Sequence, residues 1–406
     1  MPLTAISKGY RAIKNTASWL RINFQHLGLR KGMLAERDQR PTVLIALAEP
    51  GHPYYESWRA GIEANGWRVM WLQRTWTLLF SHQLFLYLAL CRHVQVVHLI
   101  DVDLRNLFGY SNAVRRWMSF ATLRLIVGWP KLLGKRVVYS FGNFVPHEDS
   151  SPVEYKRHHL ICSLVHDVIS LSPSQTRELT QSGISERHIW PAEHADIKDY
   201  FLVPEDWQPV REKMGIPPDA LVLLCIGSIR PYKGIEVAIE GVKRSKNPQI
   251  RLLIAGRPSA GYEAEDIVRL TADDERIIPG PLRHLSNAEM GWMFQGSDYC
   301  LLPYMDIGHS GLVCQSLGLG VPVIASRVGC LPDYLDGGAG LLFTPGDPDD
   351  LAHLLDNALG QFDYERARAA SLRIMGLRPP ERIGSRLVSI YAYSNGSPSP
   401  ETEWLF

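Results

Sequence analysis

The most constraining feature of the chain is an alternation of short apolar runs with segments of helical pattern, repeated in two series. The first series has strand-length runs rich in β-branched residues at 42–48, 67–72, 94–99, 136–140 and 167–171. The second series has such runs at 221–226, 251–255, 276–278, 299–302, 322–325 and 340–343. Strands that alternate with helices indicate parallel α/β sheets. We therefore expect two Rossmann-like, doubly wound α/β domains that face each other across a cleft.

A stretch without periodicity separates the two series. Residues 200–217 carry prolines and polar side chains, which indicates a domain junction. We expect an N-terminal domain over 41–205 and a C-terminal domain over 206–378. We also expect a helix over 379–395 that packs back on the N-terminal domain, and a flexible tail over 396–406, where the composition is that of a disordered segment.

Charge and cysteine usage exclude several classes of protein. The net charge of +1 over 406 residues offers no overall field for nucleic acid. The charge is uneven, because residues 1–40 contain eight Lys/Arg and only two Asp/Glu, as in a basic amphipathic arm. The six cysteines are scattered and form no C-x-x-C pair, so we expect reduced core thiols in a cytosolic protein. We expect no signal peptide and no transmembrane span.

Two basic segments have the composition of interfacial helices. Residues 10–31 and 113–136 mix Trp, Phe and Leu with Lys and Arg at near-helical spacing. Such helices are attracted to anionic lipid, which predicts contact with an anionic membrane surface. The alternative, that both segments pack within the first domain, stays open.

The turn after the first run of the second series has the residues of an anion site. In "GSIRPYKG", residues 227–234, Gly227 allows a tight turn at a strand end. Arg230 can grip phosphate oxygens bidentately, and Lys233 can add a point charge beside them. The turn therefore suits a diphosphate, although a solvated loop with two surface cations would have the same letters.

A second stretch in the same domain supports this interpretation. In 302–326 a strand ends at the loop "MDIGHSG", and we expect a helix to begin near Ser310. The backbone amides of Ser310, Gly311 and Leu312 would then present an anion site at the helix N-terminus. With the cationic turn they make a diphosphate clamp. The alternative is that Ser310 is an ordinary helix N-cap.

These stretches, with "AGR" (255–257), "SDYCLLPY" (297–304) and "SGLVCQSLGLGVPVIASRVGCLPD" (310–333), resemble the GT-B glycosyltransferases of glycosyltransferase family 4. The resemblance extends over 41–395 and is stronger in the second half. It implies transfer of a sugar from a UDP- or GDP-type nucleotide sugar to a polyprenyl-diphosphate-linked saccharide, in bacterial surface or exopolysaccharide synthesis. It also implies a cytoplasmic enzyme, peripheral on the inner face of the plasma membrane, and favours retention of stereochemistry.

Carried over by position, the resemblance assigns donor-binding roles to residues of the second domain. Arg230 and Lys233 would hold the donor diphosphate, next to Gly227, and the amides of Ser310, Gly311 and Leu312 would cap it. Gln315 stands where the family usually has a glutamate that bonds the ribose. Ile307 stands at the first glutamate of the usual pair, and Asp306 is the nearest carboxylate.

The first domain departs from the family at the expected histidine. The chain has "SFGN", with Gly142 in place of that histidine and with Asn143 and His147 in the same loop. We prefer His52 as the substitute, because imidazole can take a proton near neutral pH. The alternative is a histidine that caps the helix after it. The candidate catalytic groups are therefore Arg230, Lys233, His52 and Asp306, and the candidate acceptor or sugar contacts are His52, Asp101, Asn143 and His147.

The pattern D-x-D at Asp101–Asp103 could suggest a divalent metal. A similar pattern at Asp347–Asp349 lies in an expected turn, so the pattern has little specificity. Since cationic residues are already placed for the diphosphate, we expect no metal and no other cofactor. Asp101 remains a candidate for acceptor contact or acid/base work, and inversion with His52 or Asp101 as base remains an alternative to retention.

Two other functions stay open at this point. The chain could be a non-catalytic GT-B subunit that binds a partner transferase or a lipid, which the departures from the family would permit. It could also be a nucleotide-sugar epimerase on the same architecture, which would convert the donor without any lipid acceptor.

Overall fold

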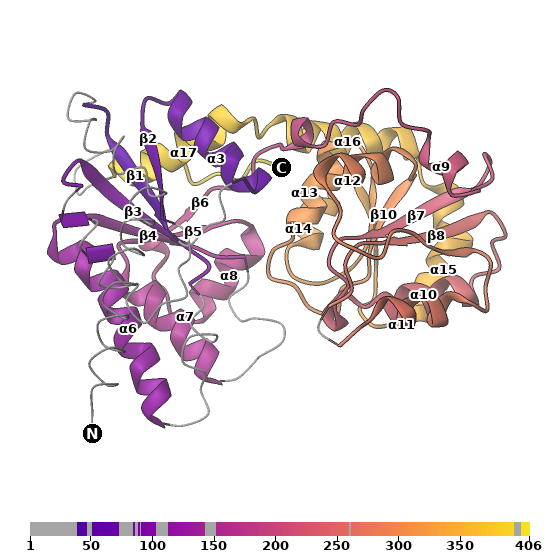
Figure 1. Cartoon of the computed structure of the whole chain (residues 1–406), viewed down its shortest axis with the longest axis horizontal. Coiled ribbons are helices and arrows are strands. Elements are labelled where there is room, and N and C mark those ends of the chain that lie inside the picture. Colours follow the sequence, from indigo (N-terminus) through magenta and orange to yellow (C-terminus); the bar gives the residue numbers. More distant parts are fainter. Residues whose placement is uncertain are drawn as a thin grey trace, which may run out of the picture. The chain divides into compact units, whose positions relative to one another are not determined.

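The computed structural model describes residues 39–46, 51–72, 84–85, 88–89, 91–102, 113–142, 152–259, 261–393 and 399–406. They include two six-stranded parallel sheets, with strand orders β2-β1-β3-β4-β5-β6 and β12-β11-β10-β7-β8-β9 (Figure 1). In both sheets the strand order departs from the chain order, as doubly wound topology requires. The expectation of two α/β domains is confirmed.

The first sheet follows the predicted runs closely. Its strands are β1 (Thr42–Ala46), β2 (Arg68–Leu72), β3 (Val94–Ile100), β4 (Arg136–Ser140), β5 (Asp167–Ser170) and β6 (Ile189–Pro191). The helices described with it are α3 (Pro53–Ala64), α6 (Ala113–Leu132), α7 (Pro152–Leu164) and α8 (Pro173–Gln181). Strand β6 was not predicted, because its short run carries a proline, which weakens the sequence signal of a strand.

The second sheet contains every predicted run, with bounds shifted by one residue at most. Its strands are β7 (Leu221–Ile226), β8 (Ile250–Ala255), β9 (Ile277–Pro279), β10 (Tyr299–Leu302), β11 (Val323–Ser326) and β12 (Gly340–Phe343). The α-helices from residue 210 onward are α9 (Val210–Lys213), α10 (Ile235–Arg244), α11 (Ala264–Thr271), α12 (Asn287–Gln295), α13 (Gly311–Gly318), α14 (Leu331–Leu335), α15 (Pro348–His353), α16 (Tyr364–Gly376) and α17 (Pro380–Ala392). A short 3₁₀ helix, η4 (Pro231–Lys233), precedes α10.

Strand β7 shows why these runs are continuous rather than alternating. Leu224 and Ile226 belong to one buried cluster, together with residues of α12 and α13. Leu223 and Cys225 belong to another, together with residues of α10 and α15. Helices therefore cover both faces of the sheet. Successive side chains of the strand point to opposite faces, and both faces are buried, so all of these side chains are apolar.

The chain divides into two compact units whose border differs from the predicted junction at 205/206. One unit contains the residues up to Pro50 and Gly66–Tyr139, and the other contains Gly51–Asn65 and Ser140–Phe406. Helix α3 thus belongs to the second unit. All contacts discussed below lie within one unit.

Helix α17 falls within the predicted range 379–395 and packs closely on α3, as their neighbouring ribbons show (Figure 1). Glycines stand where the helices meet. A Cβ on Gly61 would overlap the carbonyl of Pro380, and a Cβ on Gly384 would overlap the backbone of Gly61. The Asn65 side chain also donates a hydrogen bond to the Glu381 carbonyl at 2.9 Å. The close approach of two backbones requires glycine at both positions.

The end of the chain differs from the expected flexible tail over 396–406. Residues 399–406 are described, and Leu405 is buried. The Leu405 carbonyl accepts hydrogen bonds from Arg378 at 2.8 and 2.6 Å, and its amide donates to Glu193 at 2.6 Å. Glu193 also pairs with Arg386 at 2.9 Å. Buried charges need partners, and the backbone of this segment supplies them, which composition alone does not reveal.

All six cysteines are free and buried, as the scattered positions predicted. Burial raises the pKa of each thiol for which a shift is resolved, including Cys300, whose pKa rises to about 12. A thiol with a raised pKa forms little thiolate, so these cysteines act as small apolar core residues.

Candidate functional site

The turn after β7 is built on two glycines from neighbouring strands. Gly227 has φ +103° and donates its amide to the Ala255 carbonyl at 3.1 Å. Gly256, at the end of β8, has φ +121°, and a Cβ there would overlap the Gly227 carbonyl. Gly227 needs glycine because of its left-handed backbone, and at Gly256 left-handed backbone and close approach coincide. The turn therefore leaves the sheet at its carboxyl edge in a fixed direction.

This geometry places Arg230 beside two serines. Arg230 is half-buried, and its Nε donates to Ser228 Oγ at 3.3 Å. The Ser228 hydroxyl in turn lies 2.8 Å from the Ser259 hydroxyl, on the turn after β8. The guanidinium is thus oriented by the turn itself.

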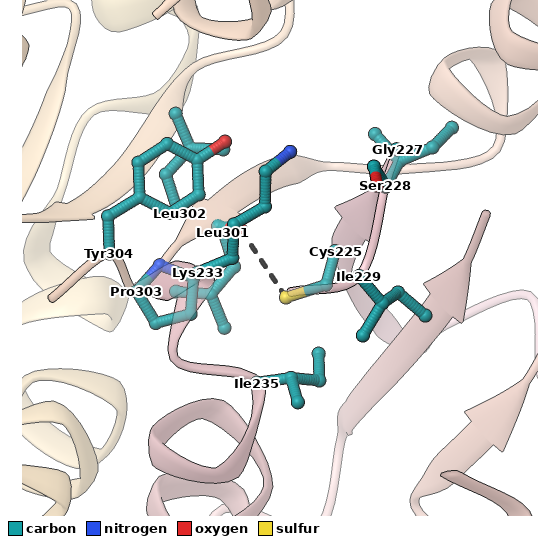
Figure 2. A pocket seen from close by; sticks show the side chains of 11 residues that line it. Cys225, Gly227, Ser228, Ile229, Lys233, Ile235, Leu301, Leu302, Pro303 and Tyr304 are labelled. Atoms are coloured by element: carbon teal, nitrogen blue, oxygen red, sulfur yellow. Dashed lines mark hydrogen bonds between the residues drawn. The ribbon is translucent and has the colours of Figure 1, made fainter. Parts of the chain in front are cut away.

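Lys233 lies in the centre of this region. Its side chain extends between the Tyr304 ring and the Gly227–Ser228 turn (Figure 2), with Nζ 5.5 Å from the ring centroid. Burial, and next the charge of Arg230, lower the pKa of Lys233 to about 8. The hollow it lines is about 20 Å³, which is room for about one water-sized group. Two cations held this close favour a ligand with more than one negative charge.

The second half of the site is joined directly to the first. Strand β10 pairs with β7 through Tyr299–Leu223 and Cys300–Leu224. After β10, the Met305 amide donates to the Tyr232 carbonyl at 2.7 Å. The strand ends of β7 and β10 are thus neighbours, and the loop of residues 303–310 begins beside the cationic turn.

This contact depends on Gly234, which has φ +63° at the start of α10. A Cβ on Gly234 would overlap the Pro303 carbonyl. The backbone of the cationic turn and the backbone after β10 therefore touch, with no room for a side chain between them.

Helix α13 begins at Gly311, close to the predicted start. Ser310 is its N-cap residue and is buried, but its side chain makes no capping hydrogen bond. Its hydroxyl instead forms a hydrogen bond with Tyr304, which slightly offsets the rise that burial causes in the pKa of Tyr304. The structure therefore departs from the alternative of an ordinary N-cap. The first-turn amides of α13 are not covered by that side chain and keep the character of an anion site.

Gln315 lies one turn into α13 and is buried. Among the residues that the structure describes, its Nε2 has no hydrogen-bond partner. A buried amide N–H without a partner costs free energy unless a ligand or water satisfies it. This is consistent with a polar ligand near the start of α13.

Ile307, at the position of the family's first glutamate, and its neighbour Asp306, the nearest carboxylate, have different surroundings. Ile307 is buried, and its carbonyl lies against Gly329, where a Cβ would overlap it. Asp306 is exposed. Burial raises the pKa of Glu178 on α8, and the charge of Asp306 raises it further. Asp306 is thus the carboxylate of this loop that faces outward, towards α8.

His52 is exposed at the N-cap position of α3, and its side chain does not cap the helix. Its ring stacks on Tyr54 with centroids 5.5 Å apart. The Tyr54 hydroxyl donates a hydrogen bond to the Gly311 carbonyl. The structure therefore brings His52 to the start of α13 through Tyr54, a residue that sequence reasoning did not single out.

The contact between Tyr54 and Gly311 gives a prediction about stability. A Cβ on Gly311 would lie 2.5 Å from Tyr54 Cε2. We expect Gly311→Ala to lower the free energy of unfolding by about 1–3 kcal/mol, because the added methyl overpacks the site. The double variant Tyr54→Ala/Gly311→Ala should lose less stability than the two single variants together, as measured by urea unfolding. Strict additivity of the two changes would contradict this contact.

Two buried histidines near Tyr54 were also missed. His194, after β6, has its ring centroid 4.2 Å from Tyr54 and 4.7 Å from His309. Burial, and then the nearby Arg378, lower the pKa of His309 to about 3, and burial lowers that of His194 as well. His309 Nε2 lies 3.1 Å from the Tyr334 hydroxyl. Both rings are neutral at pH 7. His309 lies in the loop "MDIGHSG", but the segments of the two histidines share no sequence pattern that would place the rings together.

The remaining predicted contacts cannot be placed with these residues. Asp101 is exposed at the end of β3, with φ +42°, and belongs to the other compact unit. Asn143, His147 and Asp103 lie outside the described residues, as do residues 1–38 of the basic arm. Within the described part of the chain, no group of three or more His, Cys, Asp or Glu side chains could hold a metal ion.

The lowered pKa of Lys233 predicts how stability depends on pH. The ordinary pKa is 10.5, and the folded value is about 8. Between these values the unfolded chain holds a proton that the folded chain has lost, so stability rises with pH across this window. We expect Lys233→Met to be more stable than the unsubstituted chain at pH 7, by roughly 3 kcal/mol at most. In denaturant titrations the difference should shrink from pH 8 to 10.5; a constant difference would refute the prediction.

Comparison with known proteins gives these residues a context. Residues 220–361 match the family model described as glycosyl transferases group 1. A D-inositol 3-phosphate glycosyltransferase from Mycobacterium sp. (strain JLS) is 29% identical over 183 residues, which are 44% of this chain and 41% of that protein. The chain therefore aligns with less than half the length of the curated relatives that it matches.

Solved structures match over most of the chain. Anabaena HepE in complex with UDP-glucose has a TM-score of 0.65 at 14% identity, covering 86% of this chain and 99% of that one. A Listeria monocytogenes protein described as a UDP-N-acetylglucosamine 2-epimerase has a TM-score of 0.60 at 14% identity, covering 90% and 100%. At this identity the likeness concerns the fold. The chain has the two α/β domains of the GT-B fold that its sequence predicted.

Proposed function

We propose that this chain is a glycosyltransferase that takes a sugar from a UDP- or GDP-type nucleotide sugar. The observation that carries the proposal is the contact between the turn after β7 and the backbone after β10, which sets Arg230 and Lys233 beside the loop leading to α13. The family match over residues 220–361 covers both halves of this arrangement, and solved neighbours bind UDP and UDP-glucose.

In this proposal the two cations and the start of α13 bind the donor diphosphate. Cleavage of the bond between sugar and diphosphate leaves negative charge on the diphosphate, which Arg230 and Lys233 offset. The first-turn amides of Gly311 and Leu312 add partial positive charge at the same place. A bound diphosphate would also raise the pKa of Lys233 and keep it protonated. Gln315, with its unpartnered Nε2, would bond the ribose.

We further propose that the acceptor is a lipid-linked saccharide in surface or exopolysaccharide synthesis, and that the reaction retains stereochemistry. The support is the resemblance to glycosyltransferase family 4. His52, Asp101, Asn143 and His147 are the proposed acceptor or sugar contacts, and Asp306 is a further candidate catalytic group. No metal is required in this scheme, since the cations for the diphosphate are supplied by the chain.

Contact with an anionic membrane surface is part of this proposal. Among the described residues, no helix has the length and apolarity needed to span a bilayer. On α6, Trp117 and Leu132 are 70% and 73% exposed, and Lys131 lies beside Leu132 in the sequence. Exposed Trp and Leu next to a cation suit the interface of an anionic bilayer, at the cytoplasmic face of the membrane.

A donor screen tests the proposed function. Purified protein is incubated with UDP-, GDP- and dTDP-sugars and a synthetic polyprenyl-diphosphate oligosaccharide, and nucleotide release is followed with and without EDTA. We expect acceptor-dependent release that survives EDTA. Conversion of the donor sugar without acceptor would instead identify an epimerase. The Listeria neighbour, which is described as an epimerase, has a similar fold to this chain. No release, with folding and lipid binding intact, would favour a non-catalytic subunit.

A further inference from the structure

Two grooves of the second compact unit meet at a pair of tryptophans and share no residue with the site described above. Each has a volume of about 400 Å³, within the usual range of ligand pockets. Both are lined by Trp207, which precedes α9, and by Trp292 on α12. The charged residues that line the first groove are Asp206, Lys213, Arg283 and Glu289, and those that line the second are Glu205 and Arg211.

The tryptophans form a rigid aromatic wall. Their rings meet edge to face, with centroids 6.0 Å apart at 84°. Trp292 Nε1 donates to the Gln208 carbonyl at 2.8 Å, and Lys213 Nζ lies 5.3 Å from the Trp292 ring. The polar edge and one face of Trp292 are thus already used. Trp207 is 37% exposed, so it is the ring that offers an open surface to a ligand.

Charged groups line the grooves in balanced numbers. The first groove has the anions Asp206 and Glu289 and the cations Lys213 and Arg283. The second has Glu205 and Arg211, and Arg211 is paired with Asp298 at 2.7 Å. Arg283 binds Glu289 through two hydrogen bonds, at 2.6 and 3.2 Å. This pairing, with bonds from Ser286, lowers the pKa of Glu289 to about 2, so the carboxylate stays ionised at any physiological pH. The walls therefore carry cationic and anionic side chains in equal numbers.

We propose that these grooves form a binding site for a neutral saccharide. A pyranose presents apolar C–H groups on its faces and hydroxyls at its rim, which match an aromatic plate surrounded by ionised hydrogen-bonding groups. An anionic ligand would meet Asp206 and Glu289, and a cationic ligand would meet Lys213 and Arg283. A purely apolar segment would remove the charges of Asp206 and Lys213 from water and supply no hydrogen bonds to them. The inference does not depend on the proposed transferase activity.

Saturation-transfer NMR with neutral tetrasaccharides tests the proposal. The probes are maltotetraose, cellotetraose, mannotetraose and chitotetraose, offered to the full chain. We expect saturable binding of at least one probe, weakened at least about tenfold by Trp207→Ala and largely kept by Trp207→Phe, since the second variant retains an aromatic face. Tyr155→Ala, which removes an exposed aromatic ring from α7, is the matched control and should bind normally.

Three results would overturn the inference. The first is the absence of saturable binding by all four probes, and the second is binding that Trp207→Ala leaves unchanged. The third is tighter binding of a sulfated tetrasaccharide that Lys213→Ala abolishes, because it would identify an anion site. Binding of a UDP-sugar, measured separately, should be the same in Trp207→Ala and the unsubstituted chain. Failure of the saccharide site is thereby distinguished from failure of the proposed donor site.

Discussion

Replacing Arg230 by alanine is expected to lower acceptor-dependent nucleotide release by about 10²- to 10³-fold, the usual effect of losing one group that stabilises developing charge. The turn holds the guanidinium through Ser228 at a position fixed by Gly227 and Gly256, so no other described cation of this turn except Lys233 can replace it. Steady-state kinetics with the donor identified in the screen would measure the effect. The loss should appear in kcat, since the charge develops in the transition state.

Two companion variants separate the proposed role from a loss of charge alone. Arg230→Lys keeps the charge but loses the planar fork, and it should retain an intermediate rate. Arg269→Ala removes a cation that is 77% exposed and pairs with Asp266 on α11, and it should leave the rate unchanged. If Arg269→Ala were as slow as Arg230→Ala, the general field of the domain would explain both results, and the specific assignment would be wrong.

Gly234→Ala is expected to affect both stability and activity. The position combines φ +63° with a backbone contact to Pro303 that leaves no room for a Cβ. We expect the free energy of unfolding to fall by at least about 2 kcal/mol, since strain and overlap add. Nucleotide release should fall as well, because separation of the two backbones would move Lys233 away from the loop before α13. Urea unfolding and the release assay would measure the two effects.

Gly337→Ala is the matched control for this change. A Cβ on Gly337 would have no atom within 4 Å, and its φ is not in the left-handed region. Surface changes of this kind alter stability by about 0.5 kcal/mol at most. Should Gly234→Ala behave like Gly337→Ala, the contact with Pro303 would not be what holds the two halves of the site together.

Most of the sheet architecture could be predicted from local pattern. Runs such as "LVLLCI" are apolar because helices cover both faces of the sheet, and that cause leaves its signature in consecutive residues. Strand β6 was missed because its short run carries a proline, which weakens the sequence signal of a strand. The docking of Leu405 was missed for another reason: Arg378 and Glu193, the groups that bind it, are distant in sequence. A pairing between distant segments has no local signature.

The candidate site shows the same limit. Arg230 and Lys233 could be identified as candidate donor-binding residues because the whole turn lies within eight consecutive residues. Ser310 could be identified because it precedes a predicted helix. Tyr54 and His194 could not, since their importance comes from contact with Gly311 and His309 across the fold. Gln315 was identified from the resemblance alone, and its unpartnered amide is visible only in the structure.

The buried ionic contacts around Glu193 determine which parts of the protein unfold together. Glu193 follows β6, Arg386 lies on α17, and the Leu405 amide belongs to the last residues of the chain. None of these groups can leave without stranding a charge away from water, at a cost of several kcal/mol. The terminal residues should therefore not fray independently. They should open together with α17 as one cooperative unit, although chain ends are usually the first part of a domain to exchange with solvent.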